Sequence, residues 1–214
     1  VYGEPTSNPI KESHETKRKT VYAVSKLAGE ELTKGYYQNH ADLNYTVVRF
    51  FNTYGEGQVA QFVLTKLVYA VLNGDNPLVY GDGSQKRSYG HVDDVTDGLI
   101  EIIRSSNAKN KTYNLGNSSQ IFTLKDLATR VIKILAPDSN LTVDILGHFL
   151  GTDRTEDREI FERYCDTSLA NTDFGYQPKI CIDEGIRRIA EYGRIYTNWA
   201  DSLTDIGWQD DQMT

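Results

Sequence analysis

Tyr22 and Lys26 stand four residues apart in the segment TVYAVSKLAGEEL, which covers residues 20–32. On an α-helix, side chains at this spacing lie on the same face, about one turn apart. A phenol is a weak base at neutral pH because its ordinary pKa is about 10, but a neighbouring ammonium group stabilises the phenolate and lowers that pKa. The pair can then accept a proton from an alcohol such as a sugar hydroxyl. The same spacing also occurs in helices whose lysine is merely solvated, so the neighbouring segments must decide between the two interpretations.

The segments around this pair alternate between helical and strand patterns. A polar stretch with two prolines, 4–19, predicts a surface loop. Apolar residues with helical spacing predict helices at 21–39, 59–74, 95–103, 123–135 and 183–192, and apolar β-branched runs predict strands at 45–51, 77–83, 112–116 and 141–145. Thr123 and Asp183 are the expected N-caps of the last two helices. This alternation favours an α/β fold.

Composition excludes several classes of partner. The 214 residues carry 23 basic and 30 acidic side chains, a formal net charge of −7, which argues against a nucleic-acid or anionic membrane surface. No apolar run approaches the roughly 18 residues that cross a bilayer, and no signal-peptide pattern is present. Cys165 and Cys181 are too few for a disulfide framework, and the four histidines lack zinc spacing. We expect a reduced, cytoplasmic setting, no metal site, and neither nucleic acid nor membrane as partner.

A glycine-containing turn fits a dinucleotide fingerprint only superficially. Residues 55–60 match G-x-G-x-x-A between a predicted strand and a predicted helix. Glu56 would place a negative charge beside the pyrophosphate, and three residues separate the strand from the first glycine, where a tight turn is needed. The segment is therefore interpreted as an ordinary strand-to-helix loop.

Five segments occur in a fixed order: VYGEP, YAVSKLAGEE, VVRFFNTYGEGQ, LVYGDGSQKRSYGHVDDVTDGL and TYNLGNSS. Together they resemble the extended short-chain dehydrogenase/reductase family, and within it the NAD-dependent nucleotide-sugar epimerases and dehydratases. The resemblance covers most of residues 1–190. It implies that Tyr22 is the catalytic base and that Lys26 lowers its pKa and binds the nicotinamide ribose of NAD. The fold it implies is the C-terminal part of a Rossmann-like doubly wound parallel sheet plus a small α/β substrate-binding domain.

The same resemblance assigns further site residues. Phe50 and Phe51 would lie near the nicotinamide end of NAD, and Asn52 would contact the substrate diphosphate. Arg87 would bind the nucleotide diphosphate, a role that suits a planar guanidinium group because it can bind phosphate oxygens in pairs. A later arginine is also expected to reach the nucleotide; the candidates, which the resemblance does not distinguish, are Arg154, Arg158 and Arg163. His91 and Asp94 belong to the Arg87 signature and are interpreted mainly as structural residues.

The chain departs from the family's pattern at its beginning. Relatives carry a G-x-x-G-x-x-G turn well before the catalytic tyrosine and a Ser or Thr just before VYG, and neither occurs in this sequence. The first residue is Val1 and the only methionine is Met213, so we expect further chain upstream. In domain terms, 1–56 would complete the NAD-binding Rossmann domain, 57–200 would mainly form the substrate-binding domain with some segments returning to the sheet, and 201–214 would be a tail. The chain as given should hold NAD poorly and leave part of a parallel sheet uncovered.

The leading functional hypothesis is an NAD-dependent nucleotide-sugar epimerase of the UDP-glucose 4-epimerase type. It would act on a UDP-sugar by transient oxidation at C4, using Tyr22, Lys26 and NAD. A 4,6-dehydratase or a decarboxylase of the same family is the first alternative. A non-catalytic nucleotide-sugar-binding module that lacks the NAD-binding half is the second. We expect a homodimer, since relatives pair through the helix that corresponds to 21–39.

Overall fold

The computed structural model describes residues 1–40, 42–59, 62–147 and 160–196, and the chain divides into two compact units. Unit 1 comprises Val1–Thr53, Arg87–Ile121 and Ile160–Lys179. Unit 2 comprises Tyr54–Lys86, Phe122–Glu159 and Ile180–Thr214. Three short strands carry the chain from one unit to the other: β2 (Thr53–Tyr54), β4 (Lys86–Ser88) and β7 (Ile121–Thr123).

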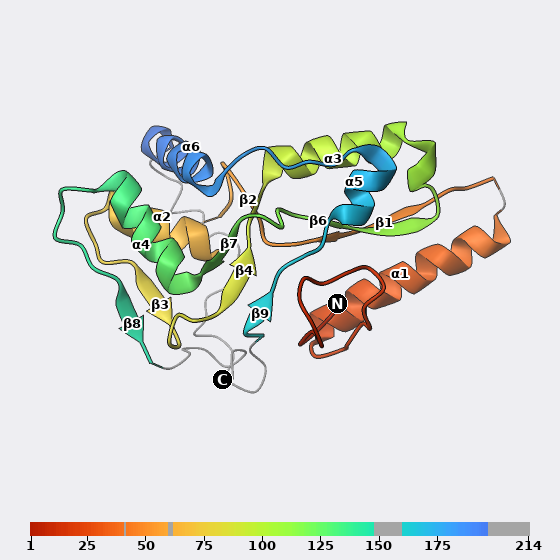
Figure 1. Cartoon of the computed structure of the whole chain (residues 1–214), viewed down its shortest axis with the longest axis horizontal. Coiled ribbons are helices and arrows are strands. Elements are labelled where there is room, and N and C mark those ends of the chain that lie inside the picture. The colour runs from red at the N-terminus through yellow and green to blue at the C-terminus, as the bar shows by residue number, and fades with distance from the viewer. Residues whose placement is uncertain (41, 60–61, 148–159, 197–214) are drawn as a thin grey trace. The chain divides into compact units, whose positions relative to one another are not determined.

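Unit 1 is built around two parallel strands. β1 (Thr46–Phe50) pairs with β6 (Lys111–Leu115), and Arg49 lies opposite Asn114 in the register. Helix α1 (Val21–Asn39) lies on one side of these strands and α3 (Val92–Arg104) on the other (Figure 1). The remaining elements of the unit are β5 (Gly90–His91), the 3-10 turn η1 (Ser106–Ala108), β9 (Glu162–Arg163) and α5 (Ser168–Phe174).

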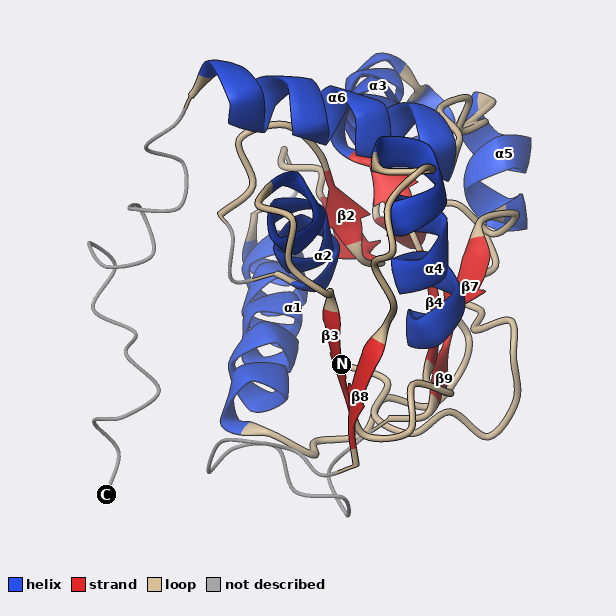
Figure 2. Ribbon diagram, turned by 90° about the vertical axis from the view of Figure 1, so that its left-hand side faces the viewer, coloured by secondary structure: helices blue, strands red, loops and turns tan. Residues whose placement is uncertain are grey.

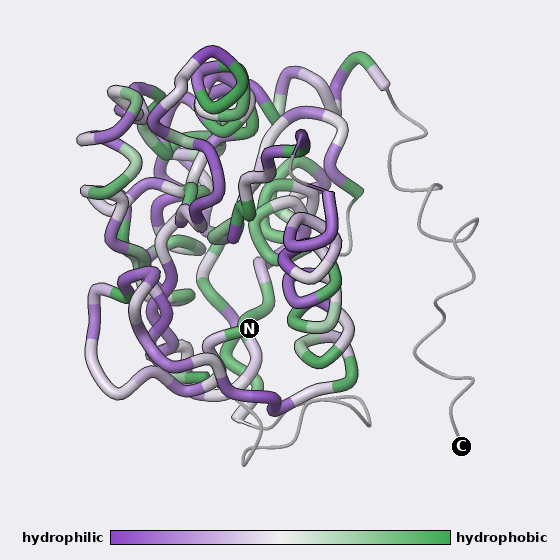
Figure 3. The backbone as a smooth tube through the Cα atoms, turned by 90° about the vertical axis from the view of Figure 1, so that its right-hand side faces the viewer, coloured by the Kyte–Doolittle hydropathy of each residue, from purple (hydrophilic) through white to green (hydrophobic). Residues whose placement is uncertain are grey.

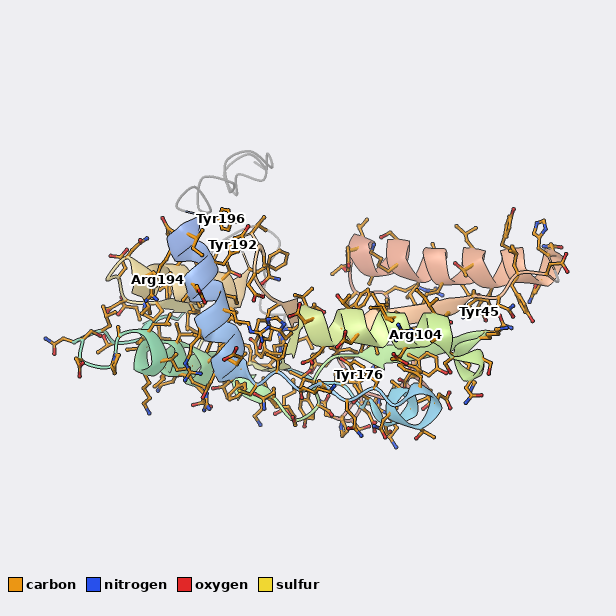
Figure 4. The ribbon with its side chains drawn as sticks, turned by 90° about the horizontal axis from the view of Figure 1, so that it is seen from above. Tyr45, Arg104, Tyr176, Tyr192, Arg194 and Tyr196 are labelled. Atoms are coloured by element: carbon orange, nitrogen blue, oxygen red, sulfur yellow. The ribbon has the colours of Figure 1, made fainter. Side chains whose placement is uncertain are left out.

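The core of unit 1 fills the side of the sheet that α3 and α5 cover. Tyr113 and Leu115 of β6 are fully buried there with Val95 of α3. The hydroxyl of Tyr176, labelled in Figure 4, donates to the carbonyl of Gly116 at 3.0 Å. Gly98 lets α3 approach this ring, since an added Cβ would lie 2.8 Å from its carbons. These contacts hold α3 against the end of β6.

Unit 2 contains three helices and a second parallel strand pair. β3 (Leu78–Tyr80) pairs in parallel with β8 (Asp144–Leu146), the two strands that run side by side in Figure 2. The helices α2 (Val63–Leu72), α4 (Leu124–Leu135) and α6 (Ile182–Ile195) pack against one another. Apart from Thr65, the buried residues of these helices are apolar or glycine, among them Leu67, Leu127 and Ile186, so hydrophobic burial holds this unit together.

The structure confirms a mixed α/β fold with parallel strands, with two corrections to the expected helices. Asp183 is not the N-cap of the last helix: the cap is Cys181, because the buried Ile182 already belongs to α6. Asp183 instead accepts a hydrogen bond from Arg130 Nη2 at 2.9 Å. Likewise α2 begins at Val63, after Phe62, whose backbone is extended. Thr123 is confirmed as an N-cap, since its hydroxyl accepts from the Asp126 amide at 3.0 Å.

Candidate functional site

Helix α1 presents Tyr22 and Lys26 on one exposed face. The helix begins after Thr20, whose hydroxyl accepts a hydrogen bond from the Ala23 amide at 3.1 Å and so satisfies one of the free N–H groups of the first turn. Tyr22 is 69% exposed. The Lys26 Nζ lies 5.2 Å from the centroid of the Tyr22 ring, within the range of a cation–π contact. The ammonium group and the phenol therefore lie on the same side of the helix, as the proton-acceptor hypothesis requires.

The end of β1 carries the next three candidates, and they differ sharply in exposure. Phe50 is 56% exposed, whereas Phe51 is 4% exposed and packs with Tyr2 at a ring-centroid distance of 6.0 Å. Asn52 has a φ of 33°, a conformation that is uncommon outside glycine and is a frequent sign of a functional constraint. Of the two phenylalanines, Phe50 is thus the one presented to solvent, while Phe51 belongs to the core.

Asn52 and Arg163 come together although 111 positions separate them. Arg163 Nη2 donates to Asn52 Oδ1 at 3.0 Å. Arg163 belongs to β9, and the neighbouring strand β4 carries Arg87. Arg87 is 9% exposed, and its Nη1 donates to the Phe161 carbonyl at 3.1 Å, one residue before β9 begins. Two guanidinium groups and a side-chain amide of unit 1 are therefore found at and beside the adjacent strands β4 and β9.

Both arginines of this cluster act on the phenol of Tyr89. Burial raises the pKa of Tyr89 to about 12, and the positive charges of Arg87 and Arg163 act in the opposite direction, so both arginines lie within electrostatic reach of that ring. Guanidinium groups bind carboxylate and phosphate oxygens through charge-assisted hydrogen bonds. A diphosphate matches this chemistry.

The described residues do not include the other two arginine candidates, Arg154 and Arg158. They also do not include the expected tail, 201–214.

His91 and Asp94 both make contacts that hold the backbone. His91 is fully buried and caps α3, where its Nδ1 accepts from the Asp93 amide at 3.2 Å. Asp94 Oδ1 accepts from the Lys179 amide at 2.9 Å. These contacts agree with a structural role for the two residues.

Three further observations concern metal binding, membrane spans and thiol reactivity. Among the described residues, no group of three or more His, Cys, Asp or Glu side chains is arranged to hold a metal ion. None of the helices within the described ranges is long and apolar enough to cross a membrane. Burial raises the pKa of the Cys165 thiol to about 12, which keeps it protonated and unreactive at neutral pH.

Glu30 and Arg49 form a buried ion pair that no motif predicts. Arg49 Nη2 lies 2.7 Å from Glu30 Oε2, and the two side chains are 10% and 9% exposed. Two features of the sequence could have suggested the pair. Arg49 is the only charged residue in the strand segment YTVVRFF, and Glu30 lies seven residues after Ala23 and hence on the same side of the helix. The pair joins the helix that carries Tyr22 to the strand that ends in Phe50.

The model of the NAD dependent epimerase/dehydratase family matches residues 1–116. The chain belongs to this family. A putative UDP-glucose 4-epimerase of Methanocaldococcus jannaschii is 29% identical over an alignment of 201 residues, and the match covers 90% of this chain and 59% of that protein. UDP-glucuronic acid decarboxylase 1 of Arabidopsis thaliana is 29% identical over 196 residues, 88% of this chain and 42% of that protein. The chain thus spans less than two thirds of the length of these family members.

Solved structures of family members share the fold. The UDP-glucuronic acid 4-epimerase of Bacillus cereus in complex with UDP-glucuronic acid and NAD aligns with a TM-score of 0.79 at 24% identity, over 91% of this chain and 59% of that one. DesIV, a dTDP-glucose 4,6-dehydratase of Streptomyces venezuelae with NAD and TYD bound, gives a TM-score of 0.79 at 23% identity, over 95% of this chain and 60% of that one. At these identities the likeness establishes a common fold.

Proposed function

We propose that the protein containing this chain is an NAD-dependent nucleotide-sugar epimerase that acts at C4 of a UDP-sugar. The observation that carries the proposal is the pairing of Tyr22 with Lys26, whose Nζ lies 5.2 Å from the ring centroid on an exposed face of α1. Family membership makes a solvated lysine the weaker interpretation of this spacing. The M. jannaschii relative, a putative UDP-glucose 4-epimerase, supports the choice of reaction.

The proposal gives a task to each of the candidate site residues that the structure describes on α1, after β1, and on β4 and β9. The Tyr22 oxygen accepts the proton of the sugar 4-hydroxyl. The Lys26 ammonium stabilises the negative charge that this oxygen carries before the transfer, and the phenol is neutral once it has taken the proton. Asn52 and Arg163, joined at 3.0 Å, contact the diphosphate from one side. Arg87 adds a second guanidinium group from the adjacent strand. Holding the diphosphate fixes the sugar, so its hydroxyl meets the phenol in a defined orientation.

The described residues fit one end of the NAD molecule. The start of α1 and the end of β1 lie toward the same end of unit 1, because the helix and the strand run in opposite directions (Figure 1). Tyr22 and Lys26, near the start of the helix, are therefore at the same end of the unit as Phe50, the last residue of the strand. An exposed amine and exposed aromatic rings suit a ribose and a nicotinamide ring. When bound, NAD supplies a reversible hydride acceptor. The sequence holds no G-x-x-G-x-x-G turn for the pyrophosphate, so these residues account for the nicotinamide end alone.

The domain division and the homodimer stay predictions. We infer that 1–56 completes a Rossmann domain, in keeping with a fold shared over about 60% of the solved relatives. Exposed apolar residues on α1 support pairing through this helix: Val21 is 88%, Leu32 74% and Tyr36 61% exposed. Figure 3 shows hydrophobic segments interleaved with hydrophilic ones along the same helix. Sedimentation of the full-length protein tests the dimer.

A decarboxylase is the second candidate, because UDP-glucuronic acid decarboxylase 1 is as similar to this chain as the epimerase relative is, at 29% identity. A decarboxylase would use the same Tyr22 and Lys26 chemistry at C4, followed by loss of the substrate carboxylate. A 4,6-dehydratase would differ after the same first step by losing water.

The discriminating experiment incubates the full-length protein with NAD and, separately, UDP-glucose, UDP-glucuronic acid and dTDP-glucose, and identifies products by NMR. The proposal predicts conversion of a UDP-sugar to its C4 epimer with no change in mass. Loss of carbon dioxide from UDP-glucuronic acid would establish the decarboxylase, and loss of water from dTDP-glucose the dehydratase. Binding of the nucleotide sugars without turnover would support a non-catalytic module.

A further inference from the structure

Helix α1 has an unusually weak apolar attachment to its unit. Of its 19 residues only Ala23 and Glu30 are buried, and they lie on the same side of the helix because they are seven positions, about two turns, apart. Leu32 and Tyr36 are exposed on other sides. A surface helix is normally fixed by a continuous apolar stripe. Here a charged residue occupies the centre of the contact face, so the rotation of the helix about its axis must depend on what that charge binds.

Glu30 binds the strand through two parallel hydrogen bonds. Arg49 Nε donates to Glu30 Oε1 at 2.9 Å, and Arg49 Nη2 donates to Glu30 Oε2 at 2.7 Å. Both side chains are at most 10% exposed. A planar guanidinium meeting a planar carboxylate in this way fixes orientation as well as distance. A single-point contact would leave the helix free to turn.

Arg49 is itself held from the other strand. Its Nη1 donates to the Tyr2 hydroxyl at 2.8 Å, and that hydroxyl donates to Asn114 Oδ1 at 2.7 Å. Asn114 lies opposite Arg49 in the β1–β6 register. The Arg49 guanidinium also lies 4.8 Å from the centroid of the Tyr2 ring. An unbroken series of side-chain hydrogen bonds thus runs from β6, through Tyr2 and Arg49, to the middle of α1.

The other polar attachment of the helix is remote from Tyr22. Near its C-terminal end, Tyr37 packs edge-to-face on Tyr45 with ring centroids 5.4 Å apart and accepts a hydrogen bond from Asn110 Nδ2 at 3.2 Å. Tyr45 is labelled in Figure 4, just before β1. Tyr37 is fifteen positions from Tyr22, whereas Glu30 is eight. Of these two polar attachments, the Glu30–Arg49 pair is therefore the nearer to the half of the helix on which Tyr22 and Lys26 stand.

We propose that Glu30 and Arg49 are positioning residues that set the rotation of α1, and with it the approach of Tyr22 and Lys26 to the substrate; this rests on the proposed function. Side-chain ends lie about 5–6 Å from a helix axis, so a 20° rotation moves them by about 2 Å. Misplacement of a reacting group by about 1 Å can cost a factor of about 100 in rate. The hydrogen bond between Arg163 and Asn52 lies outside α1, so the diphosphate contacts proposed for these two residues should stay in place when the helix turns.

The test uses the full-length protein, its NAD and the sugar nucleotide that it converts. Glu30→Gln keeps the shape of the side chain and removes its charge. Arg49→Lys keeps the charge and removes the two-pronged geometry. The matched control is Glu31→Gln, one residue further along the same helix, because Glu31 pairs with Lys34 at 2.7 Å on the exposed surface. Steady-state kinetics are measured well below the melting temperature of each variant, and each rate is divided by the folded fraction.

We expect Glu30→Gln and Arg49→Lys each to lower kcat by at least about tenfold while KM changes by less than about threefold. Glu31→Gln should leave both constants within about twofold of the parent values. A loss of thermal stability without a fall in kcat per folded molecule would overturn the inference, because it would show a purely structural role. Equal effects of Glu30→Gln and Glu31→Gln would overturn it too.

One additional variant separates this inference from the proposed function. If Tyr22→Phe is inactive and Glu30→Gln is fully active, only the positioning role fails. If Tyr22→Phe stays active, the proposed chemistry itself fails. A low kcat with an unchanged KM in both Glu30→Gln and Arg49→Lys, alongside an inactive Tyr22→Phe, supports both.

Discussion

Replacing Arg49 with methionine should destabilise the protein far more than the loss of one ordinary ion pair. Methionine is close to arginine in length but cannot donate hydrogen bonds, so the substitution leaves the Glu30 carboxylate buried and unpaired. It also removes the donor to the Tyr2 hydroxyl, which lies 2.8 Å from Arg49 Nη1. The substitution therefore acts on a buried ion pair, since the side chains of Arg49 and Glu30 are 10% and 9% exposed.

The magnitude follows from this burial. Removing one partner of a buried ion pair typically lowers the free energy of unfolding by about 3–5 kcal/mol. For a protein of about 150–250 residues, each 1 kcal/mol lowers the melting temperature by about 2–4 °C, so we expect a fall of about 6–20 °C. The exposed pair of Arg104 and Glu101, 70% and 45% exposed at 2.9 Å, supplies the control. Arg104→Met should lower the melting temperature by less than about 4 °C, because exposed pairs contribute about 0–1 kcal/mol.

Thermal unfolding followed by circular dichroism measures the difference, with the two single variants and the parent protein in one buffer. The double variant Glu30→Met with Arg49→Met should regain part of the loss, because no buried charge is left without a partner. Equal melting temperatures for Arg49→Met and Arg104→Met would refute the reasoning, since they would show that the Glu30 carboxylate is not confined to the site that the structure gives it.

Three further predictions follow from contacts in unit 1. Gly98→Ala should lower the free energy of unfolding by about 1–3 kcal/mol in thermal melts, because the added Cβ would lie 2.8 Å from a buried tyrosine ring. Gly29→Ala on α1 is the control and should be neutral or slightly stabilising, because no heavy atom lies within 4 Å of its added Cβ. Equal effects of the two substitutions would contradict this packing. Hydrogen bonding by Lys111 holds the pKa of Asp173 below its usual value. The ionised carboxylate therefore contributes to the free energy of unfolding above about pH 4, and this contribution is lost as the pH falls through the lowered pKa. The melting-temperature difference between the parent and Asp173→Asn should accordingly shrink from pH 7 to pH 3, and a constant difference would contradict the assignment. Arg163→Met should weaken UDP binding to the full-length protein by about 10- to 150-fold in calorimetry, as loss of a charged hydrogen bond implies, and an unchanged Kd would remove Arg163 from the diphosphate site.

Sequence patterns predicted the elements that carry the site better than they predicted the contacts that hold it. The helix 21–39 and the strand 45–51 follow from periodicity and β-branched composition, and the structure has them at Val21–Asn39 and Thr46–Phe50. Helix starts were predicted less well. Asp183 has the right chemistry for an N-cap, but the cap is Cys181, two residues earlier, and the buried Ile182 is the first residue of α6. Local preference yields to tertiary packing at such positions.

Long-range pairings were the part that sequence could not supply. Arg163 was one of three equivalent arginine candidates, and only the placement of β9 brings it within 3.0 Å of Asn52. Glu30 and Arg49 lie on different elements, 19 positions apart, and no local rule pairs them. The opposite exposures of Phe50 and Phe51 also depend on which side of β1 the core occupies.

The most direct test of the central claim removes a single oxygen atom. Tyr22→Phe in the full-length protein should lower turnover of its nucleotide-sugar substrate by about 10²–10⁴-fold, because the proton acceptor is gone while the ring stays. The matched control is Tyr36→Phe, an exposed tyrosine on the same helix whose ring stacks on His40 at 4.2 Å and which should retain full activity. Turnover by Tyr22→Phe within about twofold of the parent protein would contradict the account, because the proton would then leave the sugar by another route.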